Sequence, residues 1–219
     1  MGTFIQDLKY GFRMLAKNPG FTAIAVVTLA LGIGANTAIF SVVNGVLLNP
    51  MPYQEPDRLV ALYSKTPEFE HSSISYPNFL DWVRENRSFS SLAAYRHDSF
   101  SLTGMGEPER VSVEMISANF FPLLGVSPVI GRTFSAEEDQ LGAAPVVMIS
   151  GGLWKRKFAS SPDAVGQPLT LDGKTYTITG VVPANFHFYG LNFSPSDVYV
   201  PIGQWNDPTF RDRRAGMGM

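Results

Sequence analysis

The sequence predicts an α+β fold in which one N-terminal transmembrane helix precedes a two-lobed α+β domain. Two observations point to this fold. An apolar run without any charged residue extends from Phe21 to Leu48. From position 49 the 219-residue chain has the composition of a globular domain, in which patterns for short strands alternate with patterns for short helices. We therefore divide the chain into a segment 1–20, a membrane segment 21–48 and an outer domain 49–219.

The first segment, residues 1–20, is predicted to be an amphipathic helix on the cytoplasmic face of a membrane. Its large apolar residues recur at helical spacing: Phe4, Leu8, Phe12 and Leu15. Its charged residues are mostly basic: Lys9, Arg13 and Lys17, against Asp7. Basic residues beside a membrane span are usually retained on its cytoplasmic side. In this chain the basic residues precede the apolar run, and proline and acidic residues follow it. The sequence therefore places residues 1–20 inside the cell and the chain from Asn49 onward outside.

The apolar run is long enough to cross a bilayer with residues to spare. As a helix, its 28 residues would extend about 42 Å, compared with about 30 Å for a hydrocarbon core. Polar residues become more frequent toward its end, so we place the lipid-embedded part at Phe21–Ile39 and expect a helical stalk at Phe40–Leu48. A cleaved signal peptide is the alternative, but its apolar region is usually about half as long.

Small residues repeat at every fourth position inside the run, at Ala30, Gly34 and Ala38. Such a stripe lets a second helix approach closely, and membrane helices pack against one another in this way. We therefore expect a helix-packing face at these three residues. The alternative is that they reflect only the general abundance of glycine and alanine in membrane helices.

In the outer domain, alternation and short apolar runs predict strands, and capping residues predict helices. The strands are expected at Arg58–Ser64, Arg110–Ile116, Pro145–Ile149 and Asp197–Ile202. The helices are expected at Tyr76–Asn86, from a Ser117 cap through Leu124 to Gly125, and from a Ser150 cap to Phe158. Ser135 with Glu138 forms a capping-box pattern that indicates a further short turn.

A hairpin is predicted from Leu169–Leu171 and Thr175–Val182, joined by Asp172-Gly173. Asp-Gly supplies the two positive φ angles that a two-residue turn requires. The same place contains the end of a phosphate-binding loop, Gly173-Lys174-Thr175. However, Pro168 occupies the position of the first glycine of that loop, and a strand follows instead of a helix. The hairpin interpretation is therefore preferred, and we expect no nucleotide to bind here.

Composition and spacing argue against catalysis, cofactors and nucleic acid. The net charge is −2, no basic stripe suggests nucleic acid, and the absence of cysteine means that packing must stabilise the outer domain. The three histidines lack partners at metal-ligand spacing: His71, His97 and His187. The acidic group Glu137, Glu138 and Asp139 is expected to form a solvated patch at a helix start. We predict no enzyme activity, no metal and no cofactor.

Several motifs resemble those of MacB/FtsX-like ABC transporter permeases, with the large acidobacterial permeases as the most similar subgroup. They cover nearly the whole chain in the expected order: Asp7–Thr22, Leu29–Leu48, Pro52–Leu59, Ser75–Trp82, Gly131–Phe134, Ile149–Trp154 and Thr179–Phe186. The resemblance implies a first transmembrane helix followed by a MacB-like periplasmic core domain. It also implies a location in the bacterial inner membrane, with the N-terminus cytoplasmic and the main domain periplasmic.

The resemblance further implies a function as a mechanical relay. A cytoplasmic ABC ATPase subunit would drive the permease, whose stalk would pass ATP-driven motion to the periplasmic domain for efflux or envelope remodelling. The expected partners are this ATPase, other permease transmembrane helices or a second permease copy, and the lipid bilayer. Members of the family continue with three further helices, so we expect the chain to be a truncated or N-terminal part of a permease.

Two other functions are open at this stage. The chain could be a single-span, membrane-anchored periplasmic binding or sensor module without an ATPase partner, or a secreted enzyme. Association with an ATPase distinguishes the first of these from a permease, and a pocket with convergent polar groups would favour the enzyme.

Overall fold

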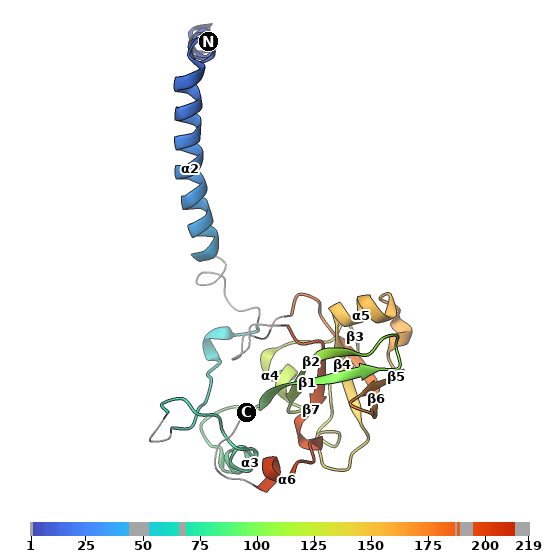
Figure 1. The fold of residues 1–219 in the computed structure, drawn as a ribbon. Coiled ribbons are helices and arrows are strands. Elements are labelled where there is room, and N and C mark those ends of the chain that lie inside the picture. Colours follow the sequence, from blue (N-terminus) through green and yellow to red (C-terminus); the bar gives the residue numbers. More distant parts are fainter. Residues whose placement is uncertain (1, 44–52, 66–68, 187, 189–194, 213–219) are drawn as a thin grey trace. The chain divides into compact units, whose positions relative to one another are not determined.

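The computed structural model of the chain describes residues 2–43, 53–65, 69–186, 188 and 195–212. Its internal contacts divide the chain into two units, Met1–Met51 and Pro52–Met219, drawn in Figure 1 as the blue helices and the remaining elements. The boundary between the two units lies within three residues of position 49, where the composition of the sequence changes.

The first unit consists of two helices, α1 (Gly2–Lys17) and α2 (Pro19–Val43). Only Asn18 separates them, and α2 begins with a proline because the first turn of a helix needs no donor at that position. The 25 residues of α2 correspond to a helix of about 38 Å, which still exceeds the hydrocarbon core of a bilayer. The expected helix is therefore present. Residues 44–48 of the predicted stalk lie outside the described residues.

The second unit combines a sheet with short helices, which confirms the α+β class. Its strands are β1 (Tyr95–Thr103), β2 (Glu109–Ile116), β3 (Ile130–Gly131), β4 (Val146–Ser150), β5 (Pro168–Leu171), β6 (Lys174–Val182) and β7 (Val198–Pro201). Its α-helices are α3 (Tyr76–Glu85), α4 (Phe120–Leu124), α5 (Gly151–Phe158) and α6 (Pro208–Asp212). Short 3-10 turns lie at Pro56–Arg58, Pro162–Ala164 and Ile202–Gln204.

The seven strands form one mixed sheet in the order β3-β6-β4-β7-β2-β1-β5. β2 and β7 run parallel, as do β4 and β6, whereas the other neighbouring pairs run antiparallel. β5 pairs with β6 as well as with β1, so the sheet curls back on itself. This curling encloses one face of the sheet and leaves the other face to be covered by helices and loops.

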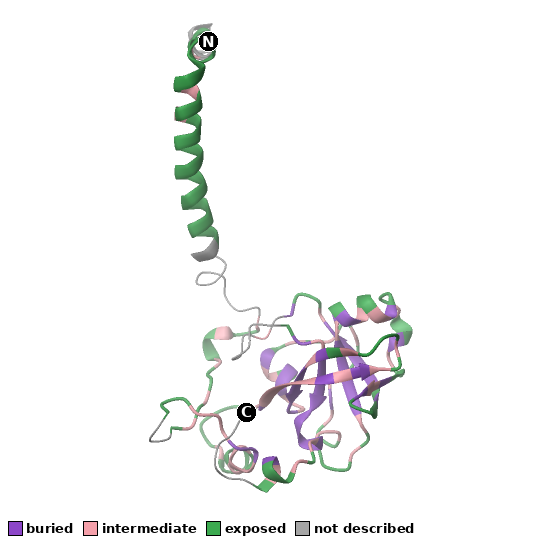
Figure 2. Cartoon of the chain, viewed as in Figure 1, coloured by how far each residue is buried: buried purple, intermediate pink, exposed green. Residues whose placement is uncertain are grey.

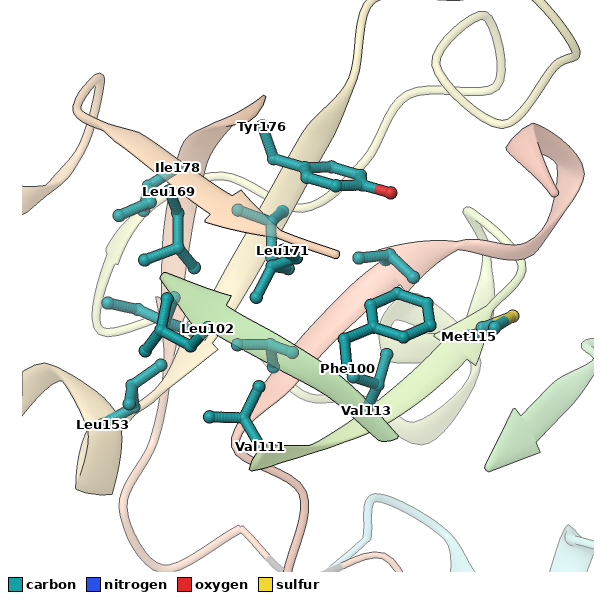
Figure 3. Close-up of a cluster of buried hydrophobic side chains, with 14 of the residues drawn as sticks. Phe100, Leu102, Val111, Val113, Met115, Leu153, Leu169, Leu171, Tyr176 and Ile178 are labelled. Carbon is teal, nitrogen blue, oxygen red and sulfur yellow. The ribbon is translucent and has the colours of Figure 1, made fainter. Parts of the chain in front are cut away.

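Two hydrophobic clusters follow from this arrangement, one on each face. In β4 successive residues alternate between them, with Val147 and Ile149 in the first cluster and Val146 and Met148 in the second. Figure 3 shows the first cluster, in which side chains from β1, β2, β5 and β6 point toward one another beside Leu153 of α5. The second cluster contains the phenylalanines of α4. Both clusters lie within one compact unit built on a single sheet, whereas the sequence had predicted two lobes.

A bulge in β6 changes the face of the sheet on which the last residues of that strand lie. Val147 pairs with Ile178 but Met148 pairs with Gly180, so Thr179 is an extra residue between the two pairs. The extra residue reverses the alternation, and Ile178 and Val181 therefore both belong to the first cluster. Strict alternation along Thr175–Val182 would have placed them on opposite faces.

Most locally encoded elements are where the sequence predicts them. The Ser75 hydroxyl accepts a bond from the Asn78 amide at the start of α3, and the Ser150 hydroxyl does the same for Leu153 in α5. The β5–β6 hairpin turns at Asp172 and Gly173, which have φ angles of 44° and 76°. The strands predicted at Arg110–Ile116, Pro145–Ile149 and Asp197–Ile202 are found as β2, β4 and β7 within one to two residues.

Two local predictions are wrong. Arg58–Ser64 is not a strand: among the described residues no strand pairs with it, and Ser64 alone forms an isolated bridge, with Ser72. Ser117 does not cap α4: the N-cap residue is Asn119, and the Ser117 hydroxyl instead accepts a bond from the Ala94 amide. The helix does end at Gly125, which has a φ of 70° as the sequence predicts.

Candidate functional site

The surface of α2 is the first candidate site. The large apolar residues of α2 whose side chains are described are exposed: Phe21, Ile24, Val26, Val27, Leu29, Leu31, Ile33, Ile39 and Phe40. Figure 2 shows this helix in green, in contrast to the purple strands of the sheet. The stretch Pro19–Ser41 is the one helix in the described part of the chain that is long and apolar enough to cross a membrane. By its residues and length, α2 is thus suited to a lipid environment.

Two polar side chains of α2 form hydrogen bonds with the backbone of the helix itself. Thr28 Oγ1 donates to the Ile24 carbonyl at 2.9 Å, and Asn36 Nδ2 donates to the Gly32 carbonyl at 3.0 Å. These bonds matter because an unpaired polar group inside a hydrocarbon layer costs several kcal/mol. Thr28 and Asn36 are therefore compatible with a membrane span.

The predicted packing residues Ala30, Gly34 and Ala38 lie in one stripe along α2, and all three are exposed. A side chain built on Gly34 would meet nothing within 4 Å. Nothing in the described structure of this chain therefore requires a small residue at position 34. The packing face stays a prediction that depends on a neighbour from outside the described residues.

A buried carboxylate that the sequence analysis missed lies in the second unit. Glu114 in β2 is only 5% exposed, and its Oε2 lies 3.3 Å from His97 Nδ1 and 3.1 Å from the hydroxyl of Ser196. Burial raises the pKa of Glu114, whereas the contacts with His97 and Ser196 lower it and offset part of that rise. The alternation of β2 had placed Glu114 on its polar face. That face is buried because the second cluster covers it.

These three residues have the types but not the order of a catalytic triad. In a triad, histidine lies between the serine and the acid, so that it can take the proton of the serine hydroxyl. Here the carboxylate of Glu114 lies between the other two groups, and both contact the same oxygen atom. The order of a Ser-His-acid triad is therefore absent from this group. The contacts join β1 and β2 to Ser196, which lies two residues before β7.

The acidic group at 137–139 also has a structural function, which differs from the predicted solvated patch. Glu138 forms two bonds of 2.7 Å with Arg132, and this pairing lowers the pKa of Glu138. Asp139 accepts bonds from the amides of Ala118 at 2.9 Å and Gly203 at 2.6 Å. Burial raises the Asp139 pKa, and the two amide bonds oppose this rise. Only Glu137 is fully exposed to solvent.

The capping box within this group is confirmed. The Ser135 amide donates to the Glu138 carboxylate at 2.8 Å, and the Ser135 hydroxyl accepts from the Glu138 amide at 3.4 Å. Gly203 completes the attachment, because a Cβ at that position would lie 2.0 Å from the Asp139 carbonyl oxygen. The segment around Asp139 therefore fastens the start of α4 to the turn after β7.

The remaining candidate positions do not assemble a chemical site. Lys174 is the first residue of β6, so a strand and not a helix follows the Gly173 turn, as predicted. Its Nζ lies 5.0 Å from the centre of the Tyr176 ring. His71 contacts the ring of Tyr63, while His187 lies outside the described residues. Among the described residues no three His, Asp or Glu side chains gather as metal ligands would.

Residues 22–217 match the model described as MacB-like periplasmic core domain. The chain belongs to this family. No curated protein matches the chain. The match begins within α2 and spans almost the whole second unit, so the MacB-like core is the part of the chain that carries the sheet and both clusters.

Two solved structures are similar to this chain. The periplasmic region of MacB from Actinobacillus actinomycetemcomitans has a TM-score of 0.50 and 13% identity, with 68% of this chain and 62% of that structure covered. The extracellular domain of the noncanonic ABC-type transporter YknZ from Gram-positive bacteria has a TM-score of 0.49 and 16% identity, with coverages of 64% and 71%. The chain thus spans less than two thirds of the MacB periplasmic structure. At these identities the first of these similarities shows the fold alone.

Proposed function

We propose that this MacB-like chain is the N-terminal part of a permease subunit in an ABC-type transporter of the bacterial inner membrane. In this proposal α2 crosses the bilayer, α1 lies in the cytoplasm, and the second unit works in the periplasm. The family match supports the periplasmic assignment of the second unit. The exposed apolar surface of α2 and the basic residues before it support the topology.

The proposed activity is the relay of motion. A cytoplasmic ABC ATPase would move the helices of the permease, and the chain would pass this motion to its periplasmic domain for efflux or envelope remodelling. Two observations together carry the proposal. The helix α2 is longer than the hydrocarbon core of a bilayer, and polar contacts such as His97–Glu114 and Gly203–Asp139 connect the elements of the second unit. A relay requires such internal connections, because loosely joined elements would absorb the motion.

A proline in α2 tests the relay. In the complete transporter with its ATPase, Ser41→Pro removes a backbone hydrogen bond near the end of α2 and disturbs the preceding turn. We expect ATP hydrolysis to continue while efflux or the envelope phenotype is lost. Ser41→Ala is the matched control, because it changes the same side chain but keeps the helix. Normal transport by the proline variant would contradict the relay, as would turnover of a substrate by the periplasmic unit.

The stripe Ala30, Gly34 and Ala38 is proposed as the contact with another permease transmembrane helix or a second permease copy. Gly34→Leu should weaken association in a membrane two-hybrid assay and leave insertion intact, because leucine is apolar but blocks close approach. Gly32→Leu is the control: it adds the same side chain to the same helix, two residues away and therefore on the other side. Equal effects of the two variants would contradict a specific face.

Partnership with an ATPase separates a permease from an anchored sensor. Affinity purification of the chain from membranes should recover a cytoplasmic ABC ATPase subunit. Protease added to spheroplasts should digest the second unit and leave a small membrane-held N-terminal fragment. Recovery of the chain without any ATPase would favour a single-span binding or sensor module.

A further inference from the structure

The basic residues of α1 form a stripe along that helix. Lys9, Arg13 and Lys17 follow one another at intervals of four residues, and all three are exposed. Four residues advance a helix by slightly more than one turn, so the three positions cover an arc of only about 80° over about 12 Å. Three positive charges on one side of a short helix form a surface that attracts negative charge.

The apolar positions of α1 follow a different stripe. Positions 4, 8, 12 and 15 carry Phe or Leu, and the helical backbone places their centre about 140° from the centre of the basic stripe. A helix with this division can lie in a membrane–water interface, with its apolar stripe in the acyl region and its basic stripe at the level of the headgroups.

The junction with α2 holds α1 at the end of the span. Thr22 Oγ1 lies 2.7 Å from the Leu15 carbonyl in the last turn of α1 and 3.0 Å from the Asn18 carbonyl. The Thr22 amide also donates to the Asn18 carbonyl, and the Asn18 amide to Leu15. These bonds connect the last turn of α1 to the first turn of α2. The basic stripe therefore ends at Lys17, two residues before the apolar helix begins.

We propose that Lys9, Arg13 and Lys17 bind the phosphate groups of anionic phospholipids in the leaflet where α2 begins. The proposal rests on the proposed membrane crossing of α2. Lys and Arg are the side chains that pair with phosphate, and clusters of them next to a span are attracted to anionic lipid. The acidic surface of a protein is the other occupant that the charge allows. Lipid is favoured because the junction keeps the stripe beside the bilayer.

Hydrogen exchange of the full chain in lipid nanodiscs tests the proposal. We compare nanodiscs of phosphatidylcholine with nanodiscs in which about one third of the lipid is phosphatidylglycerol. The α1 amides should exchange about threefold more slowly, or slower still, in the anionic nanodiscs, because bound headgroups restrain the helix. About 0.5 M salt should abolish the difference. Inorganic phosphate added to the zwitterionic nanodiscs should not reproduce it.

Matched variants identify the residues responsible. The variant Lys9→Gln, Arg13→Gln and Lys17→Gln should show equal exchange in both lipids. The control variant Lys65→Gln, Arg87→Gln and Lys155→Gln removes the same charges from exposed positions of the second unit and should retain the difference. Retention of the difference by the α1 variant would overturn the proposal. So would equal exchange of α1 in the unchanged chain, or protection that appears only when an ATPase is added.

The α2 amides keep this test separate from the proposed function. If α2 crosses the bilayer, its amides are strongly protected in both kinds of nanodisc. Protection of α2 together with lipid-independent exchange of α1 overturns the lipid site alone. Rapid exchange of α2 in both nanodiscs overturns the membrane crossing, and with it the permease topology.

Discussion

The helix α2 and the sheet of the second unit contain the same kinds of apolar residue in opposite environments. Phe21 in α2 is 71% exposed and Leu31 is 69% exposed, whereas Phe121 and Leu102 in the second unit are each 1% exposed. The hydrogen bonds of polar side chains also differ between the two regions. In α2 the side chains of Thr28 and Asn36 bond to carbonyls four residues earlier, whereas in the sheet Glu114 bonds to residues distant in sequence.

This difference shows that the two regions need different surroundings. The sheet makes its own apolar interior, because its curl and its α-helices enclose both faces. A single helix has no interior and can only present its apolar residues outward, so α2 requires lipid or other helices around it. Substitutions of one residue type in both regions should therefore have unequal effects.

Removal of a large ring gives the largest expected contrast. Phe121→Ala leaves a cavity among the rings of Phe120, Phe186 and Tyr199 and should lower the free energy of unfolding by about 3–5 kcal/mol. Phe21→Ala should leave unfolding of the second unit unchanged. Urea titration of the full chain in detergent, followed by tryptophan fluorescence, measures both. Equal effects would show that Phe21 packs against the second unit and would end the contrast between the two regions.

A charge introduced into α2 tests whether this helix, unlike the second unit, requires a lipid environment. Leu31→Asp should disfavour membrane insertion by about 3–4 kcal/mol, because an ionised carboxylate near the middle of a span is poorly solvated. Val60→Asp is the control: Val60 is 64% exposed in the second unit, where water and not lipid is the expected solvent. The fraction of chain recovered in membranes after alkaline extraction reports insertion. Full recovery of the Leu31 variant would argue that α2 does not span.

The buried Glu114 predicts a pH dependence for the second unit. Its pKa in the folded state is raised above the ordinary value of 4.5, so the protonated form stabilises the fold. This contribution is fully present below pH 4.5 and is lost as the pH rises through the raised pKa. A tenfold change in the protonation equilibrium on folding corresponds to about 1.4 kcal/mol. Glu114→Gln removes the titration.

Unfolding of the Glu114→Gln variant should therefore depend less on pH above 4.5 than unfolding of the unchanged chain. The groups around this carboxylate, His97, Tyr95 and Tyr199, remain in both proteins. Glu70→Gln is the control, because the Glu70 side chain is 78% exposed. Denaturant titrations at several pH values measure the difference. Identical pH profiles for all three proteins would contradict a raised pKa at Glu114.

The smallest predicted effect compares two glycines inside the second unit. Gly173→Ala should cost about 1 kcal/mol, because alanine is strained at the φ of 76° that the hairpin turn requires. Gly152→Ala should instead stabilise by up to about 1 kcal/mol. It lies inside α5, and a Cβ there meets its nearest atoms at ordinary distances of 3.6 and 3.8 Å. Thermal unfolding of both variants reports the sign, and a loss of stability in both would refute the turn argument.

The elements that the sequence predicted well are those with a local physical cause. The long uncharged run predicts a helix from its own residues alone. Ser150 caps α5 through a hydrogen bond to an amide three residues later, and Gly173 allows the positive φ angle of the hairpin turn. The stripe of Ala30, Gly34 and Ala38 was also readable from spacing, but its role depends on a neighbour and stays a prediction.

The sequence was less informative where a partner distant along the chain determines the structure. β1 was not predicted because Tyr95–Thr103 is largely polar, and β2 supplies the pairing that makes it a strand. Arg58–Ser64 alternates as a strand should, yet no neighbouring strand pairs with it. Pairing contributes the backbone hydrogen bonds of a strand, so an isolated pattern does not suffice.

By itself the sequence therefore determined the apolar helix, its basic flank, the Ser75 and Ser150 caps, the hairpin and the family of the second unit. The tertiary structure alone decided that the sheet curls until β5 meets β6, that Thr179 forms a bulge, and that Glu114 is buried beside His97 and Ser196. The reason is physical. Propensity, capping and turn geometry act over a few residues, whereas burial and strand pairing depend on groups that only folding brings together.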